Sequence, residues 1–304
     1  MSQHYDLIVI GGSAAGVAAA LTAGRCLRRT LVVDAGVPRN RFAAHMHNTV
    51  GFDGRAPGEF VNAGRAEARG YGVEFVEGTV TRLRGGDGHM GVDIATAAGA
   101  SNTHRARRVL LATGAVDELP EIPGLRERWG TAALHCPYCH GYEVAHGRLG
   151  VIATSPMSEH QGLLLTQWTR DLTFFTQGKE WAVTERLRAH GVHVVESPVV
   201  ELLGEPGVLT AVRTEAGEYP MDAVFVSSRM RPTLGFAQGL RLVTAQGPMG
   251  EFVEVDAAGR TSHPLVYAAG NVCHPGATVP VASAAGAQAA AAINMALVEE
   301  DVAG

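Results

Sequence analysis

The chain has 304 residues, of which 46% are hydrophobic and 18% charged, and its formal net charge is -5. This length and apolar content predict a globular protein with a well-buried core, divided into two domains. The slightly acidic balance gives no electrostatic reason to expect nucleic acid or an anionic membrane as a partner. The start of the chain, MSQHYDLIVIGG, lacks a cationic signal-peptide region, and its apolar run is too short for a membrane span. We therefore expect a cytoplasmic protein.

The first predicted elements are a strand, a tight turn and a helix. Residues 6–10 form an apolar run, and the sequence GGSAAG follows at 11–16 before an alanine-rich helix that reaches Ala23. In the G-x-G-x-x-G pattern, glycines permit the turn, the approach of a pyrophosphate, and close packing of helix on strand. Ser13 occupies the second glycine position, so the motif departs from the full pattern there.

A second strand at residues 30–34 ends in Asp34, which lies 23 residues after Gly11. A carboxylate at this point accepts hydrogen bonds from a ribose in dinucleotide-binding βαβ units. The sequence therefore predicts such a unit, although glycines that serve only helix packing remain the alternative. The pattern alone does not separate FAD from NAD.

The motif HCPYCH at residues 135–140 contains two of the four cysteines and allows three chemistries: haem attachment, a zinc site or a redox disulfide. Haem attachment is disfavoured because the chain shows no export signal. Zinc is disfavoured because a structural site needs four ligands, and adjacent His and Cys residues rarely reach one ion. In a cytosolic protein a close Cys pair is more often catalytic than structural.

Further strands are predicted at 108–114 and 264–271, and a helix is predicted at 283–297. A second nucleotide-type unit is predicted in the middle, with strands at 149–154 and 172–176 and a helix at 161–168.

With the glycine turn, the Cys pair and the Ala-Gly-Asn segment at 269–271, nearly the whole chain is similar to the low-molecular-weight thioredoxin reductases. The resemblance implies an α/β fold with two Rossmann-like, three-layer domains, and a homodimer. It also implies a discontinuous FAD domain at 1–116 and 247–304, interrupted by a redox-Cys domain of NADPH type at 117–246.

The middle domain departs from the reductases in its first turn, which reads SPMSEH at residues 155–160 and contains no glycine. Without glycine the backbone cannot approach a pyrophosphate, and the carboxylate of Glu159 would repel it. Lys179 alone is a poor substitute for the arginines that hold a 2′-phosphate. We therefore expect a degenerate domain that keeps the scaffold and has lost NADPH.

The sequence CPYCHGYE at 136–143 resembles the dithiol oxidases of the gliotoxin, holomycin and romidepsin pathways, in which His replaces the Asp of the reductases. Residues 38–41, with His45, His47 and Asn48, are similar to the same subset. A further departure from the reductases is Val279-Pro280, where they carry Arg-Gln. The resemblance implies FAD-dependent oxidation of a small-molecule dithiol to an intramolecular disulfide, with oxygen as acceptor and hydrogen peroxide as product.

The same resemblance implies roles for the motif. Cys136 would exchange with substrate, Cys139 would face the flavin, and His140 would be the acid/base, unless it is merely a hydrogen-bonded residue of a turn. His45 and His47 are weaker candidates, because loop histidines are usually solvated. Two cysteines are expected to be structural, Cys26 as a buried small residue in an apolar helix and Cys273 near the flavin.

The residues expected to bind FAD come from the glycine turn, the second strand, the loop that follows it, and the two later segments. Asn271 stands where the family usually has Asp and can still hydrogen-bond the cofactor. No metal ligands are expected. The expected cofactor residues are Gly11, Gly12, Ser13, Ala14, Ala15, Gly16, Asp34, Ala35, Arg41, Asn48, Val80, Ala112, Thr113, Gly114, Gly270, Asn271 and Val281.

Two other functions are consistent with these residues. A thioredoxin-like disulfide reductase would share the flavin and cysteine features and take electrons from NADPH or from another donor such as ferredoxin. A non-catalytic flavin- or metal-binding scaffold would keep its function when the cysteines are replaced.

Overall fold

A computed structural model describes residues 3–86, 88–96 and 99–303, and the chain divides into two compact units. The first unit comprises Met1–Arg41, Ala56–Val116 and Met230–Gly304. The second comprises Phe42–Arg55 and Asp117–Arg229.

This division differs from the predicted domain boundaries in two places. The chain re-enters the first unit at residue 230 and not at 247, because Met230 pairs with Gly250 in a small sheet. Residues 42–55 group with the second unit, and one contact that holds them there is a hydrogen bond from Asn48 to the carbonyl of Tyr138. Sequence patterns show neither pairing, since both depend on contacts far apart along the chain.

The first unit is built on a six-stranded sheet of order β1-β2-β3-β4-β5-β18, in which β1 also pairs with β5. Strands β1, β2, β5 and β18 run parallel and have almost wholly buried carboxyl halves, as expected for strands covered on both faces. Its strands are β1 His4–Ile10, β2 Thr30–Asp34, β3 Glu74–Gly86, β4 His89–Thr96, β5 Ser101–Leu111 and β18 Val266–Ala268.

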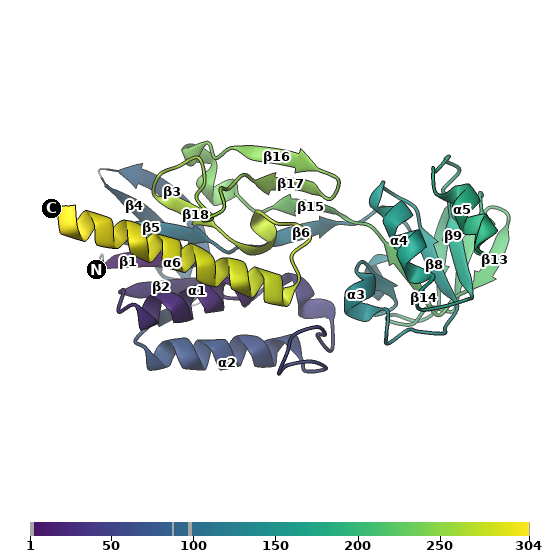
Figure 1. Cartoon of the computed structure of the whole chain (residues 1–304), viewed down its shortest axis with the longest axis horizontal. Coiled ribbons are helices and arrows are strands. Elements are labelled where there is room, and N and C mark those ends of the chain that lie inside the picture. Colours follow the sequence, from purple (N-terminus) through teal and green to yellow (C-terminus); the bar gives the residue numbers. More distant parts are fainter. Residues whose placement is uncertain (1–2, 87, 97–98, 304) are drawn as a thin grey trace. The chain divides into compact units, whose positions relative to one another are not determined.

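Two alanine-rich helices, α1 Ala14–Arg25 and α6 Val279–Ala303, lie side by side in the first unit (Figure 1). Small residues let the two backbones approach closely: a Cβ on Gly286 would lie only 2.0 Å from the carbonyl oxygen of Ala15. Helix α2 Pro57–Gly70 also contacts α1. The tight crossing therefore holds α6 against the first turn of α1, where the predicted phosphate loop ends.

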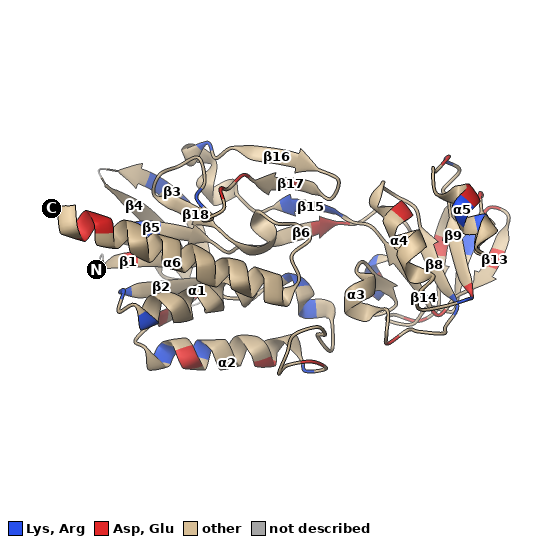
Figure 2. Cartoon of the chain, viewed as in Figure 1, with Lys and Arg blue, Asp and Glu red and all other residues tan. Residues whose placement is uncertain are grey.

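The length and hydropathy of α6 would allow it to cross a membrane, but the core helix of a soluble protein passes the same test. Ala289, Ile293 and Leu297 are buried in the core that α6 shares with α1. Its carboxyl end is acidic (Figure 2), and there Arg107 pairs with Glu300 at 3.0 Å and with Asp301 at 2.7 Å. These contacts are those of a helix packed into a folded unit.

A second, smaller sheet has the strand order β16-β17-β15-β6. Short 3-10 turns are present at Arg39–Phe42, Arg126–Arg128, Gly235–Leu240 and Gly270–Val272. The four strands are β16 Thr244–Gly247, β17 Gly250–Val253, β15 Arg229–Pro232 and β6 Ala115–Glu118.

The second unit has a parallel five-stranded sheet of order β10-β9-β8-β14-β7, the doubly-wound arrangement expected of a Rossmann-like unit. An antiparallel sheet of β11 Val199–Leu203, β12 Ala211–Thr214 and β13 Gly217–Pro220 is inserted in the chain between β10 and β14. The remaining elements are β7 Ala133–Leu134, β8 Leu149–Ile152, β9 Leu172–Phe175, β10 His193–Val195, β14 Ala223–Val226, α3 Pro137–His140, α4 Met157–Leu165 and α5 Thr184–Ala189.

Several predicted bounds were wrong. Helix α4 begins at Met157 and not at residue 161, because Pro156 already has helical angles and the buried Ser158 side chain receives backbone N–H bonds from the turn. The strand predicted at 264–271 is limited to β18, because Gly270 adopts a positive φ of 78°. Cys26 was predicted to be buried within the helix, but it is exposed and occupies the C-cap position at the end of α1.

Replacing Gly286 with Ala should destabilise the fold, because the new Cβ would clash with the Ala15 backbone. We expect a loss of about 1–3 kcal/mol in the free energy of unfolding measured with urea. The matched control is Gly58→Ala, at a helical glycine with no atom within 4 Å of the added Cβ. Equal unfolding midpoints for the two variants would contradict the tight α1–α6 packing.

Candidate active site

The glycine turn of the first unit lies where three parallel strands end. A Cβ on Gly11 would lie 2.3 Å from the oxygen of Ala112, and one on Gly12 would lie 2.9 Å from the Cβ of Asp34. A Cβ on Gly16 would meet the oxygen of Gly11 at 1.9 Å. Glycine is therefore required at all three positions, and the turn delivers the chain to the start of α1. Helix N-termini of this kind bind phosphate.

Ser13 takes the N-cap position of α1 with extended backbone angles, but its side chain makes no capping hydrogen bond to the described residues. The next residues, Ala14 and Ala15, are buried at the contact with α6, where the Ser283 hydroxyl donates to the oxygen of Ala14 at 3.4 Å. Ser13, which replaces the second glycine of the motif, thus does not cap the N-terminus of α1 with its side chain.

Asp34 lies beside the glycine turn at the end of β2, as expected for an acid that binds a ribose. Its carboxylate accepts a hydrogen bond from Arg65 of α2, which sequence reasoning missed. No local motif marks Arg65, because the two residues are 31 positions apart. The pairing places the Arg65 guanidinium against the carboxylate that lies beside Gly12.

The Ala112-Thr113-Gly114 segment follows β5 and faces the same turn. The Thr113 hydroxyl oxygen is buried and has no hydrogen-bond partner among the described residues, which is unusual for a buried polar atom. Gly114 has a φ of 66° and open space around its Cβ position. A bound cofactor would supply the missing partner, so the residues of this turn fit a dinucleotide.

Gly270 approaches the same helix, since a Cβ there would lie 3.1 Å from the Cβ of Ala15. Asn271 differs from expectation: its amide nitrogen donates to the carbonyls of His274, Pro275 and Ala277 at 2.9–3.1 Å. That nitrogen is committed to shaping the loop before α6.

Other predicted cofactor residues are placed less directly. Val80 is buried in β3, Ala35 is exposed after β2, and Val281 is half exposed at the start of α6. Arg41 lies in the first 3-10 turn and donates to the carbonyl of Pro38 at 3.1 Å. Asn48 belongs to the second unit, where its side-chain amide donates to the Tyr138 carbonyl at 2.5 Å.

The predicted redox pair forms a disulfide: Cys136 and Cys139 are bonded, with their Cα atoms 5.3 Å apart. Pro137 starts the single helical turn α3, and Cys136 caps it, since its sulfur accepts a hydrogen bond from the backbone nitrogen of Cys139 at 3.2 Å. Both cysteines are half-buried. The helical turn thus presents a disulfide that solvent can reach.

His140 completes this turn, its backbone nitrogen donating to the oxygen of Cys136 at 3.2 Å. Burial of the imidazole lowers its pKa below the usual value, the nearby Glu143 carboxylate acts in the opposite direction, and His47 lowers the pKa slightly further. The side chain is therefore largely neutral near pH 7, which is the form that accepts a proton.

The other two cysteines are not part of this turn. Cys273 is buried and contacts the oxygen of Gly270 at 3.4 Å, and burial raises the pKa of its thiol to about 12. Such a thiol is unreactive at neutral pH. Among the described residues, no group of three or more His, Cys, Asp or Glu side chains could hold a metal ion.

Two buried polar residues of α4 were missed by sequence reasoning: Gln161, which contacts the residue before the redox turn, and Ser158, which contacts the turn before α4. Gln161 donates to the carbonyl of His135 at 2.7 Å and accepts from the hydroxyl of Ser227 at 3.0 Å. One turn earlier, Ser158 is fully buried, and its oxygen accepts from the backbone nitrogens of Thr154 at 3.1 Å and Ser155 at 3.4 Å. Ser158 lies four and three residues after Thr154 and Ser155, which is the spacing of a local side-chain contact to the backbone.

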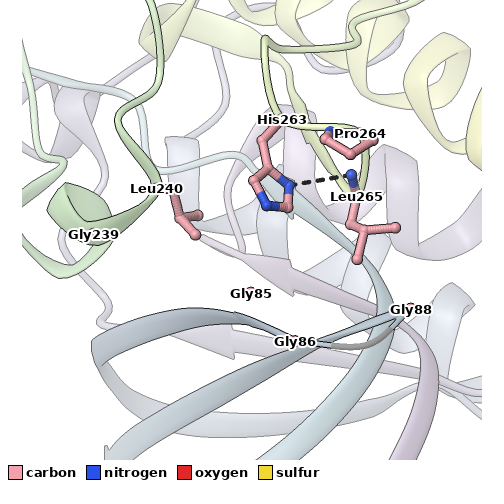
Figure 3. A pocket seen from close by; sticks show the side chains of 8 residues that line it. All are labelled: Gly85, Gly86, Gly88, Gly239, Leu240, His263, Pro264 and Leu265. Carbon is pink, nitrogen blue, oxygen red and sulfur yellow. Dashed lines mark hydrogen bonds between the residues drawn. The ribbon is translucent and has the colours of Figure 1, made fainter.

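A cavity of about 600 Å³ opens in the first unit, and none of the predicted site residues lines it (Figure 3). His263 is one of the residues that line it, and its Nδ1 accepts a hydrogen bond from the backbone nitrogen of Leu265 at 3.2 Å. A second cavity of about 540 Å³ is lined by Val281 and by the loop whose carbonyls accept hydrogen bonds from Asn271. Only the second one therefore touches predicted cofactor residues.

The fold and the disulfide turn are those of a flavoprotein thiol-disulfide oxidoreductase. A sequence model of the pyridine nucleotide-disulphide oxidoreductases matches residues 5–152 and 163–291, and the chain belongs to that family. The family implies a flavin cofactor, which the residues around the glycine turn fit.

Within the family the chain is similar to proteins named thioredoxin reductase. It is 31% identical to thioredoxin reductase tcpT of Claviceps purpurea, over 89% of this chain and 87% of the relative. It is 29% identical to sirT of Leptosphaeria maculans, over 98% and 96%. The predicted resemblance to the thioredoxin reductase type is thereby confirmed.

Two solved structures share the whole architecture. An oxidoreductase from Agrobacterium tumefaciens superposes with a TM-score of 0.90 at 40% identity, covering 98% of this chain and 99% of the other. The structure of HlmI superposes with a TM-score of 0.88 at 41% identity, covering 100% and 96%. The predicted two-domain Rossmann-like fold is confirmed by these matches.

Replacing Gly12 with Ala should weaken flavin binding about tenfold, because the added Cβ overlaps the Asp34 side chain and overpacking of this kind costs about 1–3 kcal/mol. The measurement is the ratio of flavin absorbance to protein absorbance after dialysis. Gly235→Ala, where no atom lies within 4 Å of the new Cβ, serves as the control. Full flavin retention in the Gly12 variant would exclude the turn as the cofactor site.

Burial lowers the pKa of the His263 imidazole from its unfolded value of about 6.5. His263 should therefore contribute to a loss of stability in acid. Its contribution to stability is complete above pH 6.5 and is lost as the pH falls through the lower folded-state pKa, because the unfolded chain then binds the proton more readily. In His263→Asn, which keeps an acceptor for Leu265, urea midpoints should change less between pH 7.5 and 5. The exposed His45→Asn is the control; equal slopes in both variants would refute this assignment.

Proposed function

We propose that the protein is an FAD-dependent dithiol oxidase that forms an intramolecular disulfide in a small-molecule dithiol of the natural-product type. Oxygen is the electron acceptor, and hydrogen peroxide is the product. The observation that carries the proposal is the closed turn between β8 and α4, where a nicotinamide nucleotide would have to bind if the electrons came from NADPH.

In a phosphate-binding turn the backbone N–H groups point at the ligand. Here the N–H groups of Thr154 and Ser155 both bond to the buried Ser158 hydroxyl. Glu159 follows in the first turn of α4, and its carboxylate accepts from the backbone nitrogen of Ala182 at 2.7 Å. A pyrophosphate would have to break the first two contacts and lie beside a carboxylate, so the turn disfavours NADPH.

The surroundings of the disulfide favour a small apolar substrate. Tyr138 lies between the two cysteines in sequence and is 61% exposed, and Tyr142 follows the motif and is 83% exposed. The Tyr138 ring makes an edge contact with Trp168 at a centroid distance of 6.1 Å, which holds it in place. An exposed aromatic ring that is held in this way binds apolar ligands at little entropic cost.

The residues of the turn would act in three steps. His140 accepts the proton of one substrate thiol, and the thiolate attacks Cys136, breaking the Cys136–Cys139 bond to give a mixed disulfide and a Cys139 thiolate. The second substrate thiol then attacks the substrate sulfur bonded to Cys136, and the cyclic disulfide leaves. The substrate has lost two electrons and two protons, and the enzyme holds both cysteines in reduced form.

Bound FAD supplies a two-electron acceptor that lets the two cysteines re-form their disulfide and passes the electrons to oxygen. The residues of the first unit that would hold it are the glycine turn, Asp34, Thr113 and the Gly270 segment. The side chains of Ser13 and Thr113 have no bonds that compete with a phosphate or a ribityl chain among the described residues. We further propose that the active form is a cytoplasmic homodimer.

The test is anaerobic addition of dithiothreitol to the flavin-loaded enzyme, followed by air. We expect the dithiol to bleach the flavin absorbance near 450 nm, and air to restore it with about one hydrogen peroxide per flavin. Cys136→Ser should abolish bleaching by the dithiol.

Two results would overturn the proposal. Bleaching by NADPH at a rate comparable to that by the dithiol would assign the protein to the NADPH-fed reductases. Bleaching by reduced ferredoxin, with no response to either NADPH or the dithiol, would assign it to the reductases fed by that donor.

A further inference from the structure

The segment 42–55 forms a loop that is anchored to the redox turn. It is closed by two backbone bonds between Met46 and residues 54–55, at 2.8 and 2.9 Å. Asn48 has a φ of 61°, and its backbone nitrogen donates a hydrogen bond to the Asp53 carboxylate at 2.8 Å. Its side chain bonds to the Tyr138 carbonyl, so the loop holds α3 through a direct contact.

His47 of this loop lies between two carboxylates. Its Nε2 is 3.2 Å from Oε1 of Glu143, and its Nδ1 is 3.6 Å from Oδ1 of Asp53. The His47 side chain is 20% exposed, whereas those of Glu143 and Asp53 are 39% and 67% exposed. The partly buried His47 imidazole is thus paired with Glu143, which follows His140 by three residues in the turn after α3.

Glu143 in turn acts on His140, three residues earlier. Its carboxylate raises the pKa of the His140 imidazole, opposing the effects of burial and of His47. The His135 ring also faces His140, at a centroid distance of 6.4 Å and an interplanar angle of 66°. The ionisable groups around His140 are therefore Glu143, His47 and His135, with Asp53 behind His47.

We propose that Glu143 and His47 are positioning residues for His140: the Glu143 carboxylate stabilises the imidazolium that forms when His140 takes the substrate proton, and His47 orients that carboxylate. The inference rests on the proposed function, in which His140 is the base. A base that is neutral at rest and whose protonated form is stabilised by a fixed carboxylate follows the logic of catalytic His-carboxylate pairs.

The proton transfer is balanced within this cluster. The substrate S–H bond breaks, its proton moves to the His140 ring, and the electron pair stays on sulfur as the attacking thiolate. When the substrate disulfide has left, the proton is available to solvent or to a cysteine thiolate. No oxidant is needed for this step, because the Cys136–Cys139 disulfide accepts the electrons.

The test compares Glu143→Gln with Glu205→Gln, an exposed carboxylate of the same unit. Histidine labelled with ¹⁵N allows the His140 titration to be followed by NMR, with His140→Gln identifying its signal. In Glu143→Gln we expect the His140 titration to move to lower pH. The plateau rate of flavin bleaching by dithiothreitol should fall about tenfold, with the acid limb of its pH profile displaced in the same direction. Glu205→Gln should change neither.

A second pair of variants tests His47. His47→Gln keeps a donor that can reach Glu143 and should retain most of the plateau rate, whereas His47→Ala should lose it as Glu143→Gln does. A lower rate in Glu143→Gln with an unmoved His140 titration would reduce Glu143 to a structural residue and overturn the inference. An unchanged rate and titration would do the same.

The NMR titration requires no substrate, so it separates the two claims. If dithiothreitol fails to bleach the wild-type flavin, the proposed function fails. If His140 titrates at the same pH in Glu143→Gln, in His47→Ala and in the wild type, Glu143 and His47 are not positioning residues, whatever the substrate.

Discussion

The proposed function depends most on the hydroxyl of Ser158 in the second unit. By accepting bonds from the backbone nitrogens of Thr154 and Ser155, it fixes the start of α4 at Met157. One turn later Gln161 then reaches the carbonyl of His135, the residue immediately before Cys136. A single buried serine thus both closes a phosphate-type turn and fixes the helix that supports the disulfide.

The two units differ in the turn between their first strand and the helix that follows it. In the first unit Gly11, Gly12 and Gly16 keep the turn free of Cβ atoms, and the helix start is left for a ligand. In the second unit proline and serine replace glycine, and the chain satisfies its own backbone donors. The scaffold needs only the buried strands and the helix packing, which both units keep.

Much of this could be predicted from sequence because the signals were local. The glycine turn, the acid after β2 and the Cys-Pro-Tyr-Cys turn each involve fewer than about 25 residues, and backbone sterics dictate them. The bounds of α4 were missed because the capping hydroxyl lies inside the helix and not before it. The chain re-enters the first unit at residue 230 because Met230 pairs with Gly250, and no periodic pattern in the sequence indicates that pairing.

The long-range partners of the site could not be predicted for the same reason. Arg65 reaches Asp34 from another helix, and His47 reaches Glu143 from a loop almost a hundred residues earlier. Asn48 resembled a cofactor residue in sequence, yet its side chain holds the redox turn. Such contacts follow from tertiary packing, so a motif identifies the reacting atoms more readily than the residues that orient them.

The central claim is that electrons enter through the disulfide and not from a nicotinamide nucleotide. Calorimetric titration of the flavin-loaded protein with NADPH tests it most directly, because binding is measured without any turnover. The account predicts no saturable heat up to about millimolar NADPH, a limit that corresponds to roughly 4 kcal/mol of binding energy. Saturable binding with a micromolar Kd would contradict it.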